Sequence, residues 1–108
     1  MNKYLVFESK AQAQQVIPLH KIKKIRIENQ ELCLAHTPKG FMAFAKNCPH
    51  LGEDLSKGKI NPFGEVVCPW HSYRFSLASG EECENRWKTL KTYRAEWQGE
   101  CLYVYWSS

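Results

Sequence analysis

The chain has 108 residues, 44% of them hydrophobic and 24% charged, which suits one compact folded domain and argues against disorder. The net charge is +4, but the positive residues fall in runs typical of solvated strand faces, and nothing resembles a nucleic-acid-binding motif. No apolar run reaches the length of a membrane span or a signal-peptide core, so we expect a cytoplasmic protein that does not enter a membrane.

The first half of the chain predicts a run of antiparallel strands. Residues 10–15 (KAQAQQ) are good helix formers, but the stretch is too short for a stable helix and is expected to form a turn. Residues 22–27 and 31–36 alternate between apolar and polar side chains around a short polar loop, as the arms of a hairpin do. The sequence TPKG then places Pro and Gly where a type I turn favours them, and residues 41–46 form the next predicted strand.

The second half predicts two more reversals of the chain. The sequence NPFG, residues 61–64, repeats the turn pattern between the short apolar stretches 58–60 and 65–67. Residues 90–97 and 101–106 surround a loop that contains glycine and are expected to pair as a hairpin. These elements together predict an all-β domain of antiparallel sheets, in which the central reversal brings the chain before it back towards the chain after it.

Two cysteine–histidine pairs are the candidate metal ligands. The spacing is Cys48-x-His50, seventeen residues, then Cys68-x-x-His71, with a proline after each cysteine. Two thiolates and two imidazoles suit either zinc or an iron–sulfur cluster. Cys2His2 zinc fingers place their cysteines together and their histidines together, whereas each loop here offers one of each, which favours a two-iron cluster with two Cys on one iron and two His on the other.

The sequence CPHLG followed by CPWHSYRF resembles the Rieske [2Fe-2S] signature, and the likeness extends over nearly the whole chain. The resemblance implies the Rieske fold: one domain over residues 1–108, in which a cluster-binding subdomain at about residues 46–76 sits on a larger antiparallel β base. It also implies one cluster per chain, with Cys48 and Cys68 on the inner iron and His50 and His71 on the outer iron.

Departures from the high-potential members of this family predict a low reduction potential. Those members carry an extra Cys in each loop, and the two form a disulfide; Glu53 and Trp70 stand at the matching positions. They also place hydroxyl groups where this chain has Tyr73 and Phe75, so at most one hydroxyl remains. Fewer hydrogen bonds to the cluster stabilise its reduced form less, and we expect a potential near the bottom of the Rieske range of about −150 to +300 mV.

The resemblance is closer to stand-alone ferredoxins than to oxygenase large subunits, because Leu51 stands where oxygenases commonly have Arg. In a chain of this length we also expect no room for the mononuclear-iron domain of an oxygenase. We therefore expect a monomeric one-electron carrier, not itself an enzyme, between a flavin-dependent reductase and a terminal oxygenase or similar acceptor. Two alternatives stay open: the small subunit of an oxidoreductase complex, like the nitrite-reductase accessory subunits, and a zinc-stabilised β domain that mediates binding. Neither nucleic acid nor membrane is an expected partner.

The remaining candidates have simpler interpretations. Cysteines outside the signature are expected to pack as small apolar residues, and the other histidines are not expected to be ligands; these are Cys33, Cys83, Cys101, His20 and His36. Four basic residues could form a docking rim around the loops, although a solvated surface is the default expectation; they are Lys46, Lys57, Lys59 and Arg74.

Overall fold

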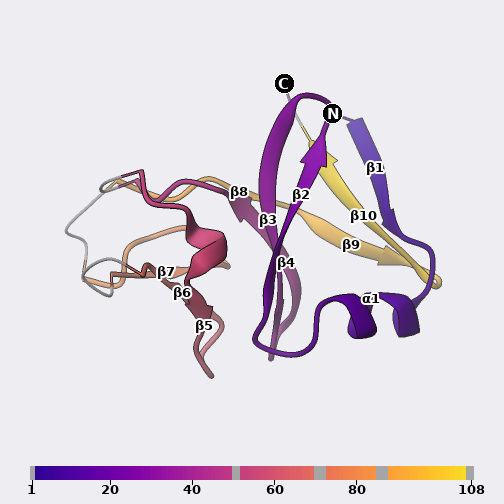
Figure 1. Cartoon of the computed structure of the whole chain (residues 1–108), viewed down its shortest axis with the longest axis horizontal. Coiled ribbons are helices and arrows are strands. Elements are labelled where there is room, and N and C mark those ends of the chain that lie inside the picture. The colour runs from indigo at the N-terminus through magenta and orange to yellow at the C-terminus, as the bar shows by residue number, and fades with distance from the viewer. Residues whose placement is uncertain (1, 50–51, 70–72, 85–87, 107–108) are drawn as a thin grey trace.

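The computed structural model describes residues 2–49, 52–69, 73–84 and 88–106, and within them the strands form three antiparallel sheets (Figure 1). The terminal sheet has the order β1 (Asn2–Phe7), β10 (Cys101–Trp106), β9 (Ala95–Gln98). The central sheet has the order β2 (Ile22–Ile27), β3 (Gln30–Thr37), β4 (Gly40–Ala45), β8 (Thr92–Tyr93). The small sheet has the order β5 (Lys59–Ile60), β6 (Glu65–Val67), β7 (Arg74–Ser76). The all-β prediction is confirmed.

A helix, α1 (Lys10–Val16), replaces the turn expected over residues 10–15, and that expectation was wrong. The Ser9 hydroxyl accepts a hydrogen bond from the Gln12 backbone N–H at 3.0 Å, and the Gln12 side chain accepts one from the Glu8 N–H at 3.1 Å. This exchange resembles a capping box, and the burial of Ala13 adds tertiary stabilisation that a short isolated helix lacks. None of the described helices is long and apolar enough to cross a bilayer.

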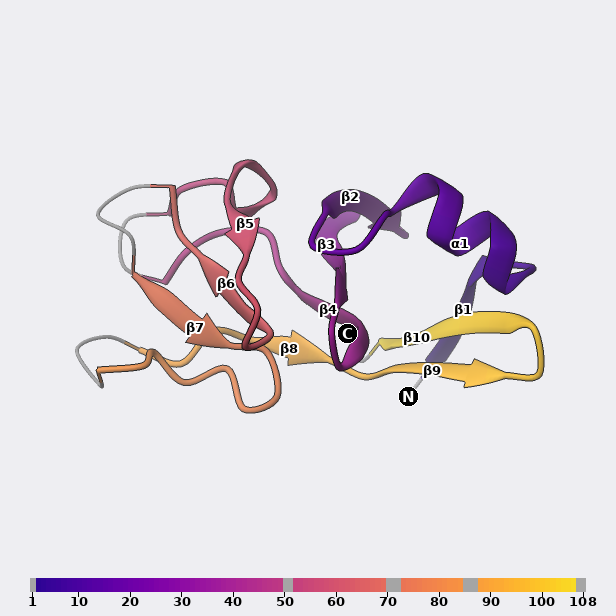
Figure 2. The same cartoon turned by 90° about the horizontal axis from the view of Figure 1, so that it is seen from below.

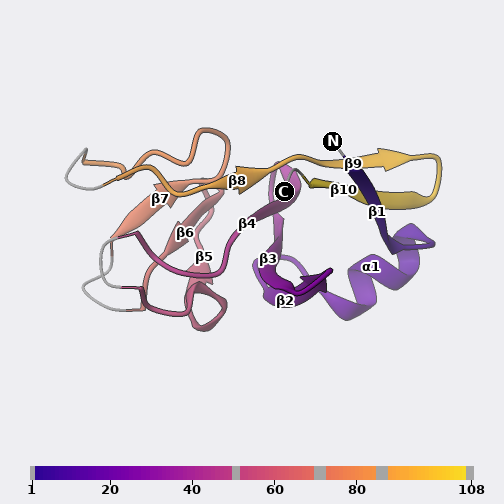
Figure 3. The same cartoon turned by 90° about the horizontal axis from the view of Figure 1, so that it is seen from above.

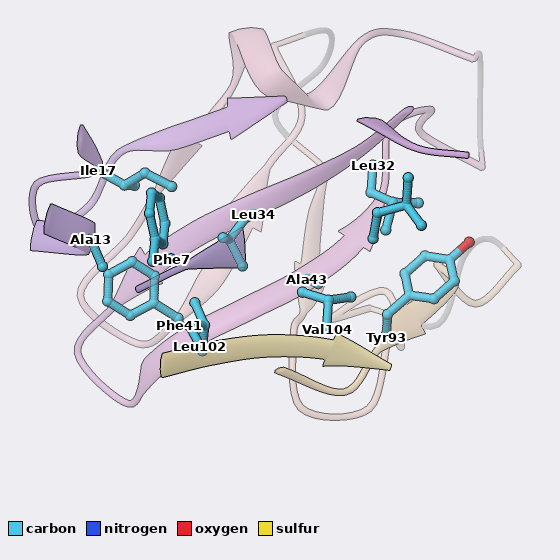
Figure 4. Close-up of a cluster of buried hydrophobic side chains, with 11 residues drawn as sticks. Phe7, Ala13, Ile17, Leu32, Leu34, Phe41, Ala43, Tyr93, Leu102 and Val104 are labelled. Carbon is cyan, nitrogen blue, oxygen red and sulfur yellow. The ribbon is translucent and has the colours of Figure 1, made fainter. Parts of the chain in front are cut away.

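The central sheet separates two hydrophobic cores, because successive side chains of a strand point to opposite faces. From β3, Leu32 and Leu34 enter the first core. Cys33 and Ala35 enter the second. The first core, shown in Figure 4, also contains Phe7, Ala13, Ile17, Ile27, Phe41, Ala43, Tyr93, Leu102 and Val104. The second core also contains Phe44, Cys48, Leu55, Ile60, Val66, Cys68, Phe75, Leu77 and Leu90.

The strand predicted over residues 90–97 is divided between two sheets, so that prediction was wrong in part. β8 pairs with β4 in the central sheet, whereas β9 pairs with β10 in the terminal sheet. The change of sheet takes place at Arg94, whose carbonyl accepts the backbone N–H of Tyr105 at 2.9 Å. The strands predicted at 22–27, 65–67 and 101–106 lie where the sequence places them, while β1 and β7 were not predicted.

The small sheet belongs to a segment inserted between two neighbouring strands. β4 and β8 are hydrogen-bonded to each other, and the Ala45 N–H donates to the Lys91 carbonyl at 2.9 Å, so residues 46–91 leave and re-enter the central sheet at one place. Within this segment the predicted reversal at 61–64 is present. The Asn61 side-chain oxygen accepts hydrogen bonds from the backbone N–H groups of Phe63 and Glu65, both at 3.0 Å. Figures 2 and 3 show the small sheet at one end of the molecule and α1 at the other.

Candidate metal centre

Cys48 and Cys68 are the two predicted ligands that the structure describes, and both are buried, at 2% and 1% exposure. Cys48 follows β4 after a short link, and Cys68 follows β6 directly. Both side chains belong to the second core, so the structure brings them to the same end of the molecule. His50 and His71 lie outside the described residues, as do Leu51 and Trp70, and their positions stay predictions.

The first loop is closed by backbone hydrogen bonds around Cys48. The Cys48 N–H donates to the Glu53 carbonyl, and the Gly52 N–H donates to the Cys48 carbonyl, both at 2.8 Å. Gly52 has φ +74°, a left-handed conformation that a glycine adopts without the steric cost of a side chain. The Asn47 side-chain amide adds a bond to the Gly52 carbonyl at 2.9 Å. These bonds hold the backbone on both sides of the predicted ligand His50.

Asp54 ties the end of the first loop to the central sheet. Its carboxylate accepts the Ser56 backbone N–H at 2.9 Å and so caps η1 (Leu55–Lys57), and its second oxygen lies 3.2 Å from Lys24 Nζ on β2. Burial raises the pKa of the Asp54 carboxyl, but hydrogen bonds from Ser56 and the Lys24 ammonium outweigh that effect, and the net pKa is lowered. The Leu55 N–H also donates to the Lys46 carbonyl at 2.7 Å.

The second loop repeats the closure of the first. The Cys68 N–H donates to the Tyr73 carbonyl at 2.7 Å, so in both loops the cysteine is bonded to the residue five positions later. The flanking strands β6 and β7 pair with Val67 opposite Arg74, which makes this loop the tip of a hairpin. Each predicted histidine therefore lies in sequence within a loop that its own cysteine closes.

Gly58 allows the two cysteine-bearing segments to approach closely. A Cβ at this position would lie 2.2 Å from the Val67 carbonyl oxygen, closer than any side chain tolerates. The next residue, Lys59, pairs directly with Val67, the residue before Cys68. The chain leaving the first loop is thus packed against the strand that leads into the second.

The described part of the site fits a thiolate-bound metal. The two buried cysteines belong to the second core together with apolar side chains, among them Leu55, Val66 and Phe75. Soft thiolates suit iron–sulfur clusters and zinc, and an apolar surrounding limits access of water. Within the described ranges no group of three metal-binding side chains gathers, and two of the four predicted ligands lie outside those ranges.

The three other cysteines lie outside the two cysteine loops, and none of the five cysteines forms a disulfide. Cys33 is fully buried in the second core, and burial raises the pKa of its thiol to about 12. Cys101 is half-buried on β10. Outside the second core, His36 stacks on Phe41, with 4.3 Å between the ring centroids.

Sequence reasoning missed a polar cluster around Glu65 on β6. Its carboxylate accepts hydrogen bonds from the Cys83 thiol at 3.0 Å and from the Asn61 side-chain amide at 2.7 Å. The same carboxylate lies 3.4 Å from Arg74 Nη1. Burial, followed by the hydrogen bond to Glu65, raises the pKa of the Cys83 thiol to about 11. The hydrogen bond from Cys83 is the largest cause that lowers the pKa of Glu65. The cluster depends on the register of β6 against β7, which no local pattern encodes.

Comparison with known proteins identifies the type of domain. A family profile described as the Rieske [2Fe-2S] domain matches residues 7–94. A curated human protein named Rieske domain-containing protein is 33% identical over 58 residues, which is 51% of this chain and 37% of the human protein. The matched stretch therefore spans little more than a third of that relative.

Two solved structures share the fold over nearly their whole length. The ferredoxin of carbazole 1,9a-dioxygenase from Nocardioides aromaticivorans IC177 superposes with a TM-score of 0.80 at 17% identity, covering 96% of this chain and 97% of the ferredoxin. A Mycobacterium tuberculosis protein described as the small subunit of an NADH-dependent nitrite reductase has a TM-score of 0.79 at 14% identity, covering 95% and 93%. At these identities the likeness establishes the fold.

Proposed function

The chain belongs to the Rieske [2Fe-2S] domain family, and from this premise we propose that it carries single electrons between redox proteins. Membership confirms the resemblance seen in the sequence, the Rieske fold and the [2Fe-2S] cluster as cofactor. When bound, such a cluster takes up and releases one electron at a time. The observation that supports the proposal is the pair of buried cysteines, Cys48 and Cys68, at the start of two loops closed in the same way.

The proposed ligands are Cys48, His50, Cys68 and His71, one of each kind from each loop. The described residues contribute the setting: one backbone hydrogen bond joins the two ends of each loop, and the apolar second core keeps water from the sulfurs. We propose the organisation expected from the sequence, one domain over residues 1–108 with a cluster-binding subdomain at about 46–76.

The proposed partners are a flavin-dependent reductase as donor and a terminal oxygenase or similar acceptor. The likeness to the carbazole 1,9a-dioxygenase ferredoxin over 97% of that chain supports this place in an oxygenase system. We propose that the chain works as a monomer in the cytoplasm and passes its electrons to a partner that acts on the substrate, so that it is itself no enzyme.

The second candidate function is the small subunit of a larger reductase, favoured by the equally good superposition on the nitrite reductase small subunit. Purification of the protein from its source separates the two. A carrier elutes alone at the size of a monomer, whereas a subunit elutes with a larger protein in fixed stoichiometry. The zinc-stabilised module is set aside, because the family binds [2Fe-2S] clusters.

Absorption and EPR spectroscopy of the dithionite-reduced protein test the cluster assignment. We expect a coloured protein with the rhombic signal of a histidine-ligated [2Fe-2S] cluster. His50→Ala and His71→Ala should each abolish that signal. Cys33→Ser is the control, because Cys33 lies in the central sheet outside both loops and should leave the signal in place. A colourless, EPR-silent protein with one zinc per chain would overturn the proposal.

A further inference from the structure

A groove of about 290 Å³ lies beside the second cysteine loop. Its lining is formed by Lys57, Gly58, Lys59, Val67, Cys68 and Pro69. Gly58 contributes only backbone to the lining, and that backbone packs closely against Val67, whose carbonyl oxygen a Cβ at position 58 would meet at 2.2 Å. The groove is bordered by the two lysines that flank Gly58 in the sequence and by Cys68, a proposed cluster ligand.

The two lysines are held by regular structure on both sides of Gly58. Lys57 is the last residue of η1, and Lys59 is the first residue of β5. Lys59 is the antiparallel partner of Val67, so its Cα lies about 5 Å from that of the residue that precedes Cys68. Both lysine side chains are exposed. Their backbone is fixed beside the loop, while their ammonium groups reach solvent.

These lysines differ from the other cations near the two loops. Lys24 is paired with Asp54, Lys46 with Glu31 and Arg74 with Glu65, at distances of 3.2 to 3.4 Å. Among the described residues neither lysine of the groove takes part in an ion pair. Glu53 is the other described acidic residue of the first loop, and no described ion pair joins it to either lysine. Two cations without a described ion-pair partner therefore line the groove that borders Cys68.

We propose that this lysine groove receives carboxylate side chains from the docking face of a redox partner protein. The inference rests on the proposed function, because the groove borders Cys68, a proposed cluster ligand. Beyond that function, it specifies that the docking face of the partner is negatively charged. Opposite charges on two docking faces speed and orient their encounter. An acidic face aligned on Lys57 and Lys59 would meet the molecule at the small sheet, which lies at the end opposite α1 (Figure 2).

Binding of a fluorescently labelled hexaglutamate peptide tests the charge recognition directly. Measured by anisotropy at low ionic strength, the affinity should fall about fivefold in the K57Q/K59Q variant and should fall with added salt. The control K3Q/K10Q removes the same charge from β1 and α1, outside the small sheet and both cysteine loops, and should change the affinity less than about twofold. Equal losses in the two variants, or no binding by the unaltered protein, would overturn the proposal. Displacement of the peptide by inorganic phosphate at matched ionic strength would also overturn it, since the groove would then be a phosphate site.

Electron transfer to small oxidants of opposite charge gives a second, independent readout. One electron from the reduced protein converts hexacyanoferrate(III) to hexacyanoferrate(II), and the cationic tris(phenanthroline)cobalt(III) is reduced likewise. A shift in reduction potential moves both rates in the same direction, whereas loss of local positive charge slows the anionic oxidant and speeds the cationic one. The ratio of the two rate constants should fall about fivefold in K57Q/K59Q and stay nearly constant in K3Q/K10Q.

The two proposals fail in different ways. A protein without the Rieske EPR signal, or one that reduces neither oxidant, would overturn the electron-carrier function. A protein with the signal and an unchanged rate ratio in K57Q/K59Q would overturn the acidic docking face alone.

Discussion

Phe75 occupies a position at which the high-potential members of the family carry a hydroxyl group. The structure places its ring, 0% exposed, in the second core together with Cys48 and Cys68, and a phenyl ring has no group that can donate a hydrogen bond to a cluster sulfur. We therefore predict a midpoint potential below zero, near the lower end of the range of about −150 to +300 mV. A potentiometric titration followed by EPR measures it, and a midpoint above zero would contradict the prediction.

The Cys83 thiol should react slowly despite being only half-buried. Its pKa of about 11 leaves about a hundredfold less thiolate at pH 8 than an unperturbed thiol has. Part of the pKa increase comes from the Glu65 carboxylate, so Glu65→Gln should accelerate alkylation by iodoacetamide, measured by peptide mass spectrometry. Cys33 serves as the internal control, since its burial should protect it equally in both proteins.

At the scale of elements, the contact between η1 and β6 depends on Gly58. Gly58→Ala would force the Val67 carbonyl away, and we expect a loss of about 1–3 kcal/mol in unfolding free energy. The EPR line shape should also change, because the displaced strand leads into Cys68. Gly99→Ala is the control: it strains a left-handed turn with nothing within 4 Å, so stability should fall without any spectral change. Urea unfolding and EPR of both variants check the prediction.

Asp54 should make the link between η1 and the central sheet sensitive to acid. Its folded-state pKa lies below the ordinary value of 3.8, so its stabilising contribution is complete above about pH 5 and is lost as the pH falls below about 4. Asp54→Asn should cost about 1 kcal/mol at pH 7, through the weakened cap and the lost pair with Lys24. Denaturation at pH 7 and pH 3.5 should show this difference narrowing in acid. A constant difference would contradict the prediction.

Elements whose signals are local could be predicted from the sequence, and those that depend on distant partners could not. The two cysteine loops carry their own spacing, and the turn at 61–64 carries its own Asx and glycine residues. The S-x-x-Q pattern at residues 9–12 is a capping signal from which α1 could have been predicted. It was outweighed by the shortness of the helix-forming stretch. The change of sheet at Arg94 has no local sequence signal, because the residues before and after it all suit a strand. Which sheet each half joins depends on the distant strands β4 and β10 with which they pair.

For the whole molecule, the two cores predict two levels of stability. The first core contains neither Cys48 nor Cys68, whereas both contribute to the second. Removing the cluster should therefore speed amide exchange in β5, β6, β7 and the adjoining loops, while the terminal sheet, whose buried side chains belong to the first core, keeps its protection. Hydrogen–deuterium exchange with mass spectrometry of loaded and chelator-treated protein measures this. A uniform loss of protection would show one cooperative unit instead.

The hydrogen bond between Ala45 and Lys91 has a consequence for how such a domain can diversify. The segment between these residues leaves and re-enters the central sheet at adjoining points, so its length can change without separating β4 from β8. The segment that contains Cys48 and Cys68 can then vary while the strands on either side of it keep their pairing.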